Sequence, residues 1–600
     1  MTDKYTNRYV KKTIDLLFFN FIGILIGLIF FSDYSYSNEN NENKPSIKLT
    51  ANDSLKALNK FKADIDNVLS VGLLKRAKYG VAVYSITNKK YIYSKNLTNE
   101  VTPASNTKLF TTFNAFNTMG PDYRIETTVF TDGNIKDSVL DGNLYIVGKG
   151  DALLTVTDIE YLADAIIEKG IKKINGNIYA DGSFYDTMTQ RVSYSGDKDI
   201  VEPLQPITAL TLNQNIAAIL IHSGSTPGKP VSVQLVPPSE AFIIQNYATI
   251  AGVKKTLKQS GKKIIKTKKN YDKKNHIKQK IKINSNKHKI TVRKSKKTTY
   301  NYQYIEQRFG DVPPVPSPAS RRRPRITVST KIDSSGLQKF IINGSLTAGM
   351  NYSYRYFIQN PNLVVAGTLK NRLESGGVKI TGKIGLGLLQ SVRTKTGLLA
   401  EINRPLMDLI YLTNKNSDNY LAETIFKMTG AYSGNHINNS MQSKEKLFEA
   451  IKRYNIPCTD CVINDGSGLS RRNRVTVDAI LHLLIESKKL NFGNKYDSSL
   501  TIAGIDGTLV NRMKNTLAEN NLRAKTGTLN NTSALSGFVN TQDGELFAFS
   551  FVFNGGSVSS YKQIENKLGV LLANFKYSSI IENDKKSEEK KVVKSKQKRK

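Results

Sequence analysis

Three short motifs contain side chains that can carry out nucleophilic chemistry. Ser105 is followed three positions later by Lys108, a Ser-Asp-Asn motif spans Ser417–Asn419, and a Lys-Thr-Gly motif spans Lys525–Gly527. A serine hydroxyl becomes a nucleophile when a nearby base takes its proton, and a lysine can be that base when burial or a neighbouring cation lowers its pKa. The motifs predict a serine acyl-transfer site with Ser105 as nucleophile, Lys108 as base and Lys525 as the neighbouring cation.

The residues around Ser105 predict the first turn of a buried helix. Pro103 suits a helix start, and the residues after it alternate apolar and polar side chains at helical spacing. A separation of three places Ser105 and Lys108 on one helix face, and the helix N-terminus favours negative charge that develops on oxygen. A Ser-Xaa-Xaa-Lys pattern alone means little in a chain rich in both residues, but the apolar surroundings favour this one.

The second motif lies between two helix-like segments, residues 405–412 and 420–428. We therefore expect a loop that points Ser417 and Asn419 inward. Ser417 would relay a proton toward a leaving amine with Lys525 nearby. Asn419 would hold both the amide of the substrate and Lys108.

The third motif opens a run of strand-like segments, which continues at residues 534–539 and 545–553 through a turn at 542–544. We expect the motif on an edge strand that lines the active-site cleft and pairs with an extended, peptide-like substrate. A second Lys-Thr-Gly, at Lys395–Gly397, precedes Ser417 and is interpreted as a chance match.

Each residue on this strand has an expected contact. Lys525 would attract a carboxylate, and Thr526 would orient the substrate. The backbone N–H groups of Thr528 and Ser105 would form an oxyanion hole. Gly527 would allow the substrate or neighbouring backbone to come close, although an ordinary strand glycine explains this residue equally well.

Three further segments extend these motifs into a family pattern: Asn416–Glu423, Asn464–Arg471 and Ala503–Leu509. With them the chain resembles the class C, low-molecular-mass penicillin-binding proteins of the D-alanyl-D-alanine carboxypeptidase/endopeptidase type, peptidase family S13. The resemblance covers roughly residues 50–250 and 335–575. It implies a serine-type enzyme without a cofactor, which acts on peptidoglycan stem peptides through an acyl-enzyme at Ser105 and is inhibited by penicillin and other β-lactams.

The resemblance also implies an α/β (α+β) fold. Residues 50–125 and 400–580 would form a transpeptidase-like domain, as in penicillin-binding proteins and β-lactamases, with an antiparallel sheet flanked by helices. Residues 126–399 would form inserted, β-rich accessory domains. Within them Gly-Lys-Gly-Asp at 148–151 departs from the Gly-Gly-Gly-Asp that the family tends to show, and Asp151 is a candidate contact to the substrate side chain.

Two other functions stay open. A serine β-lactamase could use the same site, but Ser417 lies 309 positions after Lys108, and no Glu-Xaa-Xaa-Leu-Asn segment of the class A β-lactamase type occurs. A catalytically silent envelope-binding protein could use its basic insertion instead. Retention of every motif residue argues against that second alternative.

The formal net charge of +37 is concentrated locally, since residues 254–297 carry nineteen Lys or Arg against the single acid Asp272. We interpret residues 254–325 as a basic, low-complexity insertion, and 581–600 as a basic, disordered tail. The insertion falls where the family has a small accessory domain, which we expect to be altered or lost. It could contact anionic envelope polymers or lipids. A nucleic-acid module is disfavoured because the insertion offers no folded aromatic stacking platform.

The N-terminus predicts export. Four basic residues precede the apolar run Leu16–Phe31, and small residues at 35–37 suit a cleavage site, so residues 1–37 are a signal peptide or an uncleaved anchor. We expect a periplasmic protein that is soluble or loosely associated with the membrane. In an exported chain, the only two cysteines, Cys458 and Cys461, favour a local disulfide over a redox or metal site. The five histidines show no metal-binding spacing, so no metal is expected.

Overall fold

The computed structural model describes residues 51–197, 201–252, 325–389, 397–434 and 437–577. The predicted signal peptide, most of the basic insertion and the C-terminal tail lie outside these ranges. Residues 61–575 belong to one compact unit, and the described residues 51–60 and 576–577 belong to another. Among the helices in the described part of the chain, none combines the length and the apolar character that a bilayer crossing requires.

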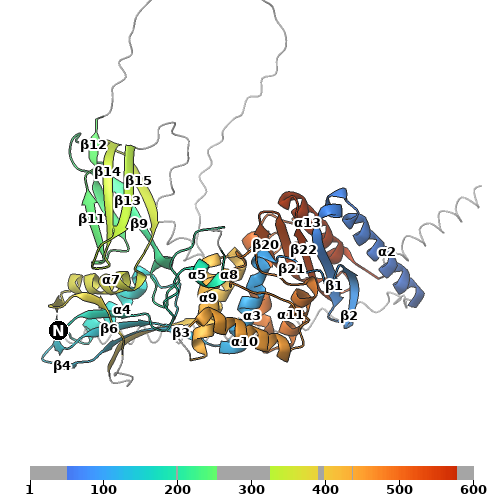
Figure 1. Cartoon of the computed structure of the whole chain (residues 1–600), viewed down its shortest axis with the longest axis horizontal. Coiled ribbons are helices and arrows are strands. Elements are labelled where there is room, and N and C mark those ends of the chain that lie inside the picture. The colour runs from blue at the N-terminus through green and yellow to red at the C-terminus, as the bar shows by residue number, and fades with distance from the viewer. Residues whose placement is uncertain (1–50, 198–200, 253–324, 390–396, 435–436, 578–600) are drawn as a thin grey trace, which may run out of the picture. The chain divides into compact units, whose positions relative to one another are not determined.

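An antiparallel sheet joins two distant parts of the sequence (Figure 1). Its strand order is β19-β20-β21-β22-β1-β2, so β1 pairs with β22 across more than 450 residues. Strands β21 and β22 are buried along almost their whole length, which suits their mainly apolar and aromatic residues. The strands are β1 Lys78–Ser85, β2 Lys90–Lys95, β19 Thr501–Ile502, β20 Arg523–Leu529, β21 Thr532–Asn540 and β22 Leu546–Asn554.

Helices supply the cover that this buried sheet needs. α11 packs on β1 and β22, and α13 packs on β21. α3 is buried on all sides from Thr107 to Phe116 and contacts α8, α9, α10 and α11, which makes it the central helix of the core. The helices are α3 Thr107–Met119, α8 Leu406–Asn416, α9 Asn419–Tyr432, α10 Asn439–Arg453, α11 Val477–Lys489, α12 Gly493–Ser499 and α13 Val558–Asn574.

The chain between α3 and α8 forms further sheets. A five-stranded sheet has the order β17-β8-β6-β3-β18, and a four-stranded sheet has the order β16-β7-β5-β4. Helices α4 (Val156–Glu168) and α7 (Pro361–Ser375) pack against each other, and α7 also contacts β8. The strands are β3 Arg124–Thr131, β4 Asn134–Lys136, β5 Val139–Asp141, β6 Leu144–Gly148, β7 Lys173–Ile174, β8 Ile178–Asp181, β16 Lys379–Ile380, β17 Ile384–Leu386 and β18 Leu398–Pro405.

Two smaller sheets flank the basic insertion. One has the order β10-β9-β15, and in the other β11, β12 and β13 all pair with β14. β12 ends just before the undescribed residues and β13 begins directly after them, so strands of one sheet lie on both sides of the insertion. The strands are β9 Ile216–His222, β10 Ser232–Val236, β11 Phe242–Asn246, β12 Thr249–Ala251, β13 Arg325–Ile332, β14 Gln338–Thr347 and β15 Asn351–Phe357.

These elements confirm the expected mixed α+β fold with an antiparallel sheet and flanking helices. The expected hairpin is present as β21 and β22, which pair over their whole length. β20 is not the outermost strand, because β19 pairs with Arg523 and Ala524, but no described strand covers Lys525–Gly527 on this side, so the motif itself lies at an open edge as expected. Of the second Lys-Thr-Gly, Lys395 and Thr396 lie outside the described residues, and β18, which follows it, pairs with β3 in a different sheet.

Candidate active site

Ser105 lies in a tight 3₁₀ turn, Ala104–Asn106, that leads directly into α3. The sequence placed it in the first turn of the helix itself. Ala104 has a φ of 50°, a left-handed conformation that a residue with a Cβ adopts only when its surroundings impose it. Ala104 and Asn106 are buried whereas Ser105 is partly exposed, so the turn presents the hydroxyl of Ser105 to the outside of the core.

Lys108 sits one turn into the helix and is completely buried. Its Nζ lies 3.0 Å from Ser105 Oγ, 2.7 Å from Asn419 Oδ1 and 2.6 Å from the backbone oxygen of Ser467. Burial lowers the pKa of Lys108 to about 8, although nearby carboxylates, Asp418 foremost, favour the charged form. Lys108 is therefore close enough to Ser105, and its pKa is low enough, for its neutral form to act as the base.

The Ser-Asp-Asn motif occupies the junction between α8 and α9, as its sequence context predicted. Ser417 ends α8 in a left-handed conformation with φ 57°, and Asp418 caps α9 by accepting a hydrogen bond from the backbone N–H of Leu421. Asn419 is the first residue of α9. The sharp turn directs Ser417 to Lys525 and Asn419 to Lys108.

Lys525 is the second fully buried lysine. Its Nζ donates to Ser417 Oγ at 2.8 Å and to the backbone oxygen of Thr526 at 2.9 Å. Burial, with repulsion by Lys108, holds the pKa of Lys525 well below its usual value. We expected Lys525 to lower the pKa of Lys108; burial is instead the cause there, and the repulsion appears at Lys525.

Strand β20 carries the rest of this motif past the Ser105 turn. The Thr526 hydroxyl lies 2.7 Å from that of Thr508, while the side chain of Thr528 is exposed. A Cβ on Gly527 would lie only 2.8 Å from the backbone oxygen of Pro103, so a glycine is needed for the strand to pack against the turn. Beyond the two residues that β19 covers, no described strand pairs with this side of β20.

Two groups of the site, the Glu202 carboxylate and the Ser467 backbone carbonyl, lie outside the three sequence motifs. Glu202 Oε2 accepts a hydrogen bond of 2.7 Å from Asn419 Nδ2, which places an exposed carboxylate one side chain away from Lys108. The Ser467 carbonyl belongs to a segment that we noted only as a family pattern. A lone Glu and a backbone carbonyl carry no sequence signal of this kind, because only the fold brings them to Lys108.

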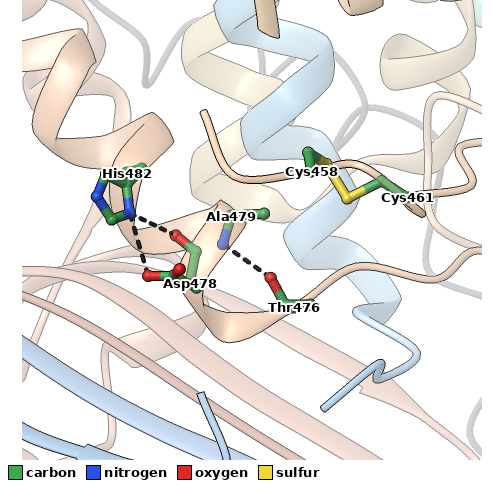
Figure 2. The surroundings of a disulfide bond; sticks show 6 residues. All are labelled: Cys458, Cys461, Thr476, Asp478, Ala479 and His482. Carbon is green, nitrogen blue, oxygen red and sulfur yellow. Dashed lines mark hydrogen bonds and ion pairs between the residues drawn. A yellow bond between two sulfur atoms is a disulfide. The ribbon is translucent and has the colours of Figure 1, made fainter. Parts of the chain in front are cut away.

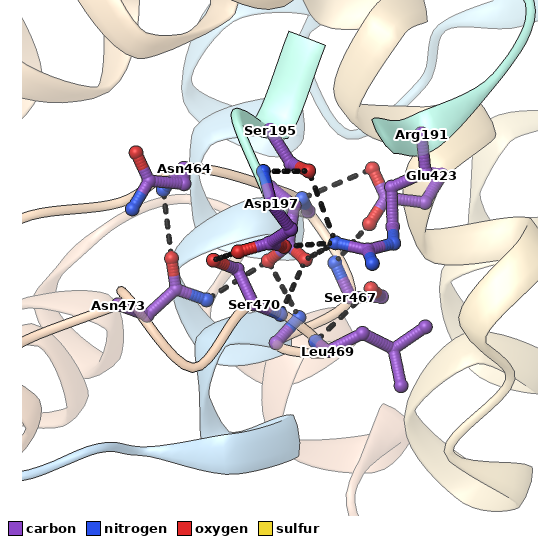
Figure 3. Close-up of polar contacts among 12 residues, drawn as sticks. Arg191, Ser195, Asp197, Glu423, Asn464, Ser467, Leu469, Ser470 and Asn473 are labelled. Atoms are coloured by element: carbon purple, nitrogen blue, oxygen red, sulfur yellow. Dashed lines mark hydrogen bonds and ion pairs between the residues drawn. The ribbon is translucent and has the colours of Figure 1, made fainter. Parts of the chain in front are cut away.

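The loop that carries Ser467 lies within a buried polar network (Figure 3). Glu423 accepts hydrogen bonds from the backbone N–H groups of Gly466 and Ser467, at 3.2 and 2.8 Å. Asp465 accepts hydrogen bonds from the backbone N–H groups of Gly468 and Ser470, at 3.0 and 2.7 Å. Both carboxylates are completely buried.

Asp151, the candidate substrate contact, is not brought to this cluster. Its side chain is 1% exposed, and its two oxygens accept hydrogen bonds of 2.7 and 2.8 Å from Arg404 Nε. Arg404 Nη2 also contacts Asp158 on α4 at 3.2 Å. This geometry is that of a structural ion pair, and it gives the predicted substrate contact no support.

Cys458 and Cys461 form a disulfide between residues three positions apart (Figure 2). The same view shows the start of α11, where the Thr476 side chain accepts a hydrogen bond from the backbone N–H of Ala479. Within the described ranges, no three His, Cys, Asp or Glu side chains are grouped as metal ligands would be. The disulfide closes the loop that leads into the Asn464–Ser470 segment.

Comparisons with known proteins find relatives over most of this chain. A D-alanyl-D-alanine carboxypeptidase of Actinomadura sp. (strain R39) is 26% identical over 538 residues, which cover 86% of this chain and 85% of that protein. The crystal structure of penicillin binding protein 4 (dacB) from Haemophilus influenzae superposes with a TM-score of 0.60 at 21% identity, over 85% of this chain and 99% of that one. The same protein complexed with a β-lactam gives a TM-score of 0.56 at 20% identity, over 84% and 98% of the two chains.

These two structures share the fold with this chain. The sequence also identifies the family. The sequence model of one peptidase family matches residues 61–312 and 326–575, which is well over half of the chain. That span includes all three motifs and the two segments on either side of the basic insertion. The resemblance first indicated by the motifs is confirmed, and this chain belongs to the D-Ala-D-Ala carboxypeptidase 3 (S13) family.

Proposed function

We propose that this protein is a serine-type D-Ala-D-Ala carboxypeptidase, a DD-endopeptidase, or both, and that it cleaves peptidoglycan stem peptides. The observation that carries the proposal is the 3.0 Å contact between Ser105 Oγ and the Nζ of buried Lys108. A second buried lysine, Lys525, donates a hydrogen bond to Ser417 in the same site. Membership of the S13 family supports this reaction over the two alternatives. The arrangement of Ser105 and Lys108 suits the transfer of an acyl group to the serine hydroxyl.

In the acylation step, neutral Lys108 takes the proton of the Ser105 hydroxyl while Ser105 Oγ attacks the carbonyl carbon of the penultimate D-Ala. The negative charge that develops on the carbonyl oxygen is accepted by the backbone N–H groups of Ser105 and Thr528. In endopeptidase mode the attacked carbonyl belongs to the D-amino-acid cross-link. Both modes produce the same ester on Ser105.

The leaving amine needs a proton. Ser417, which accepts a hydrogen bond from Lys525, can give its hydroxyl proton to that amine and recover one from Lys525. Lys525 and Thr526 also face the position where the terminal carboxylate of the substrate would bind. The proton that Lys108 took from Ser105 then replaces the one that Lys525 gave up, which leaves Lys108 neutral again. Lys108 next takes a proton from the water that attacks the ester, and this proton returns to Ser105 Oγ when the acyl group leaves.

A mass measurement tests this function. Purified residues 38–600 and the Ser105→Ala variant are incubated with a penicillin, and the release of D-Ala from a peptide ending in D-Ala-D-Ala is measured in parallel. We expect a long-lived penicillin adduct and D-Ala release from the wild type, and neither from Ser105→Ala. Rapid turnover of the drug without an adduct would favour a β-lactamase, and no reaction at all would favour the silent envelope-binding protein.

Export to the periplasm and cleavage of residues 1–37 remain predictions, as does contact between residues 254–297 and anionic envelope polymers or lipids. The high density of lysine and arginine supports the last of these. Co-sedimentation with anionic lipid vesicles, with and without these residues, tests it. Salt-sensitive binding that requires residues 254–297 is the expected result.

A further inference from the structure

The base of the proposed reaction has to aim a lone pair at the Ser105 hydroxyl. Neutral Lys108 has two N–H donors and one lone pair. Two of its three neighbours, the Ser467 backbone oxygen at 2.6 Å and Asn419 Oδ1 at 2.7 Å, can only accept. When they take both N–H groups, the lone pair is left for Ser105 Oγ at 3.0 Å. The position of the Ser467 carbonyl therefore decides where the base points.

The loop that carries this carbonyl forms no helix or strand of its own. Its backbone is bound instead by the buried carboxylates of Glu423 and Asp465. Burial and, after it, the neighbouring charge of Asp465 raise the pKa of Glu423 to about 7. Two buried carboxylates side by side need a cation or strong donors, or one of them takes up a proton and loses an acceptor.

One short helix, α5 (Arg191–Ser195), supplies a cation for Asp465 and a hydrogen-bond donor for Glu423. Arg191 Nη1 donates to Asp465 Oδ2 at 3.0 Å, and the Tyr194 hydroxyl donates to Glu423 Oε2 at 2.9 Å. The Arg191 side chain is only 3% exposed. It lies 274 positions before Asp465 in the sequence, in the chain between β8 and β9.

The residues after this helix add two more contacts. Arg191 Nη1 also donates to Asp197 Oδ2 at 2.6 Å, and the Ser470 hydroxyl donates to Asp197 Oδ1 at 2.8 Å. Figure 3 shows Arg191 and Asp197 placed against the Ser467–Ser470 stretch of the loop. The segment Arg191–Asp197 thus touches the loop at several points while making no described contact to Ser105 or Lys108.

We propose that Arg191 is a positioning residue for acylation, which acts through Asp465 to fix the loop whose Ser467 carbonyl orients Lys108. The inference rests on the proposed function, because it assumes that Lys108 is the base. It makes a segment outside the three motifs, and outside the sheet and helices that carry them, necessary for the rate of the first chemical step.

The test uses Arg191→Met in the full-length mature chain and a fluorescent penicillin at saturating concentration. Two quantities are measured: the rate constant of Ser105 labelling and the fraction of protein labelled at the end. We expect the rate constant to fall about 100-fold, because a displacement of about 1 Å in a catalytic group has an effect of that size. The labelled fraction should stay high. A residue that only stabilises the fold would lower the fraction and leave the rate constant of the folded molecules unchanged.

A matched control comes from the other end of the chain. Arg512 also pairs with a buried carboxylate, Glu565 on α13, at 2.8 Å. Arg512→Met should lower the unfolding temperature but keep the labelling rate constant within about threefold of the wild type, since independent sites act separately. Arg191→Lys should recover most of the rate, because all the hydrogen bonds of Arg191 leave from Nη1 alone and an ammonium can replace it.

The proposal is overturned if folded Arg191→Met is labelled as fast as the wild type. If that variant does not fold, Glu423→Gln decides, because it keeps the side-chain volume and removes a buried charge. A glutamine amide would turn an N–H toward Gly466 or Ser467 and displace the loop, so we expect slower labelling; an unchanged rate constant overturns the proposal. Failure of the wild type to be labelled at Ser105 would instead reject the proposed function.

Discussion

At the scale of single residues, the site depends on two buried lysines with different tasks. Lys108 has to be neutral to accept a proton, and its surroundings bring its pKa to about 8. Glu202 works against this, since its negative charge is one of the influences that raise the pKa of Lys108. It reaches Lys108 through a single side chain, Asn419.

This arrangement predicts how acylation depends on pH. The neutral fraction of Lys108 grows as the pH rises through its pKa, so the second-order rate constant for penicillin acylation should rise with pH and level off above about 8. Glu202→Gln removes the charge that favours protonated Lys108, so the rise should move to lower pH. The measurement is the acylation rate constant from pH 6 to 10.

Glu401→Gln, at an exposed position of strand β18 in another sheet, is the control and should leave the pH profile unchanged. A Glu202→Gln profile identical to the wild type would mean that Glu202 does not influence Lys108. A profile without any rise near pH 8 would mean that Lys108 is not the group whose protonation limits acylation.

At the scale of elements, the turn before α3 is held by close contacts from two glycines. A Cβ on Gly468 would lie 2.0 Å from the backbone oxygen of Ala104, and a Cβ on Gly527 would lie 2.8 Å from that of Pro103. The left-handed Ala104 between these contacts is the residue directly before the nucleophile. The loop and strand β20 therefore determine together where Ser105 is presented.

Gly527→Ala should slow acylation more than it destabilises the protein. The added methyl group pushes β20 and the turn apart, and a shift of a few tenths of an ångström in Ser105 should lower the acylation rate constant at least about tenfold. Gly72→Ala is the control, because a Cβ there meets nothing within 4 Å. Equal acylation by both variants would show that the Gly527 contact does not position Ser105.

At the scale of the whole molecule, two segments more than 400 residues apart in the sequence build one sheet, and the intervening chain returns to support the site. Strand β1 pairs with β22, which follows residue 500, and β2 extends the sheet by pairing with β1. The segment Arg191–Asp197, from the intervening part, contacts the Asp465 loop. The additional chain is therefore connected to the chemistry through this loop and through Glu202.

We predict that the basic insertion can be deleted without loss of the fold or of activity. β12 and β13 both pair with β14, where Thr249 and Arg325 both lie opposite Ser345, so the strands that enter and leave the insertion are about 10 Å apart, two strand spacings. Replacing residues 253–324 by a short Gly-Ser linker should leave the acylation rate constant and the unfolding temperature unchanged. A large loss of either would show that these residues contribute to the fold or to the site.

The sequence alone determined which residues could react. Ser105, Lys108, Ser417, Asn419 and Lys525 were all recognisable because their types and spacing are local features of the chain. The junction of α8 and α9 and the hairpin of β21 and β22 were equally predictable, since helix ends, turns and apolar runs depend on neighbouring residues.

Only the tertiary structure decided what surrounds those residues. Arg191, Glu202 and the carbonyl of Ser467 meet Lys108 or its supporting loop from distant parts of the chain, and Asp151 is paired with Arg404 rather than turned to the site. The pKa of Lys108 likewise depends on burial, which no local spacing reveals. The physical reason is range: spacing along the chain reports contacts within a helix or a turn, whereas desolvation and charge pairing depend on which distant segments pack together.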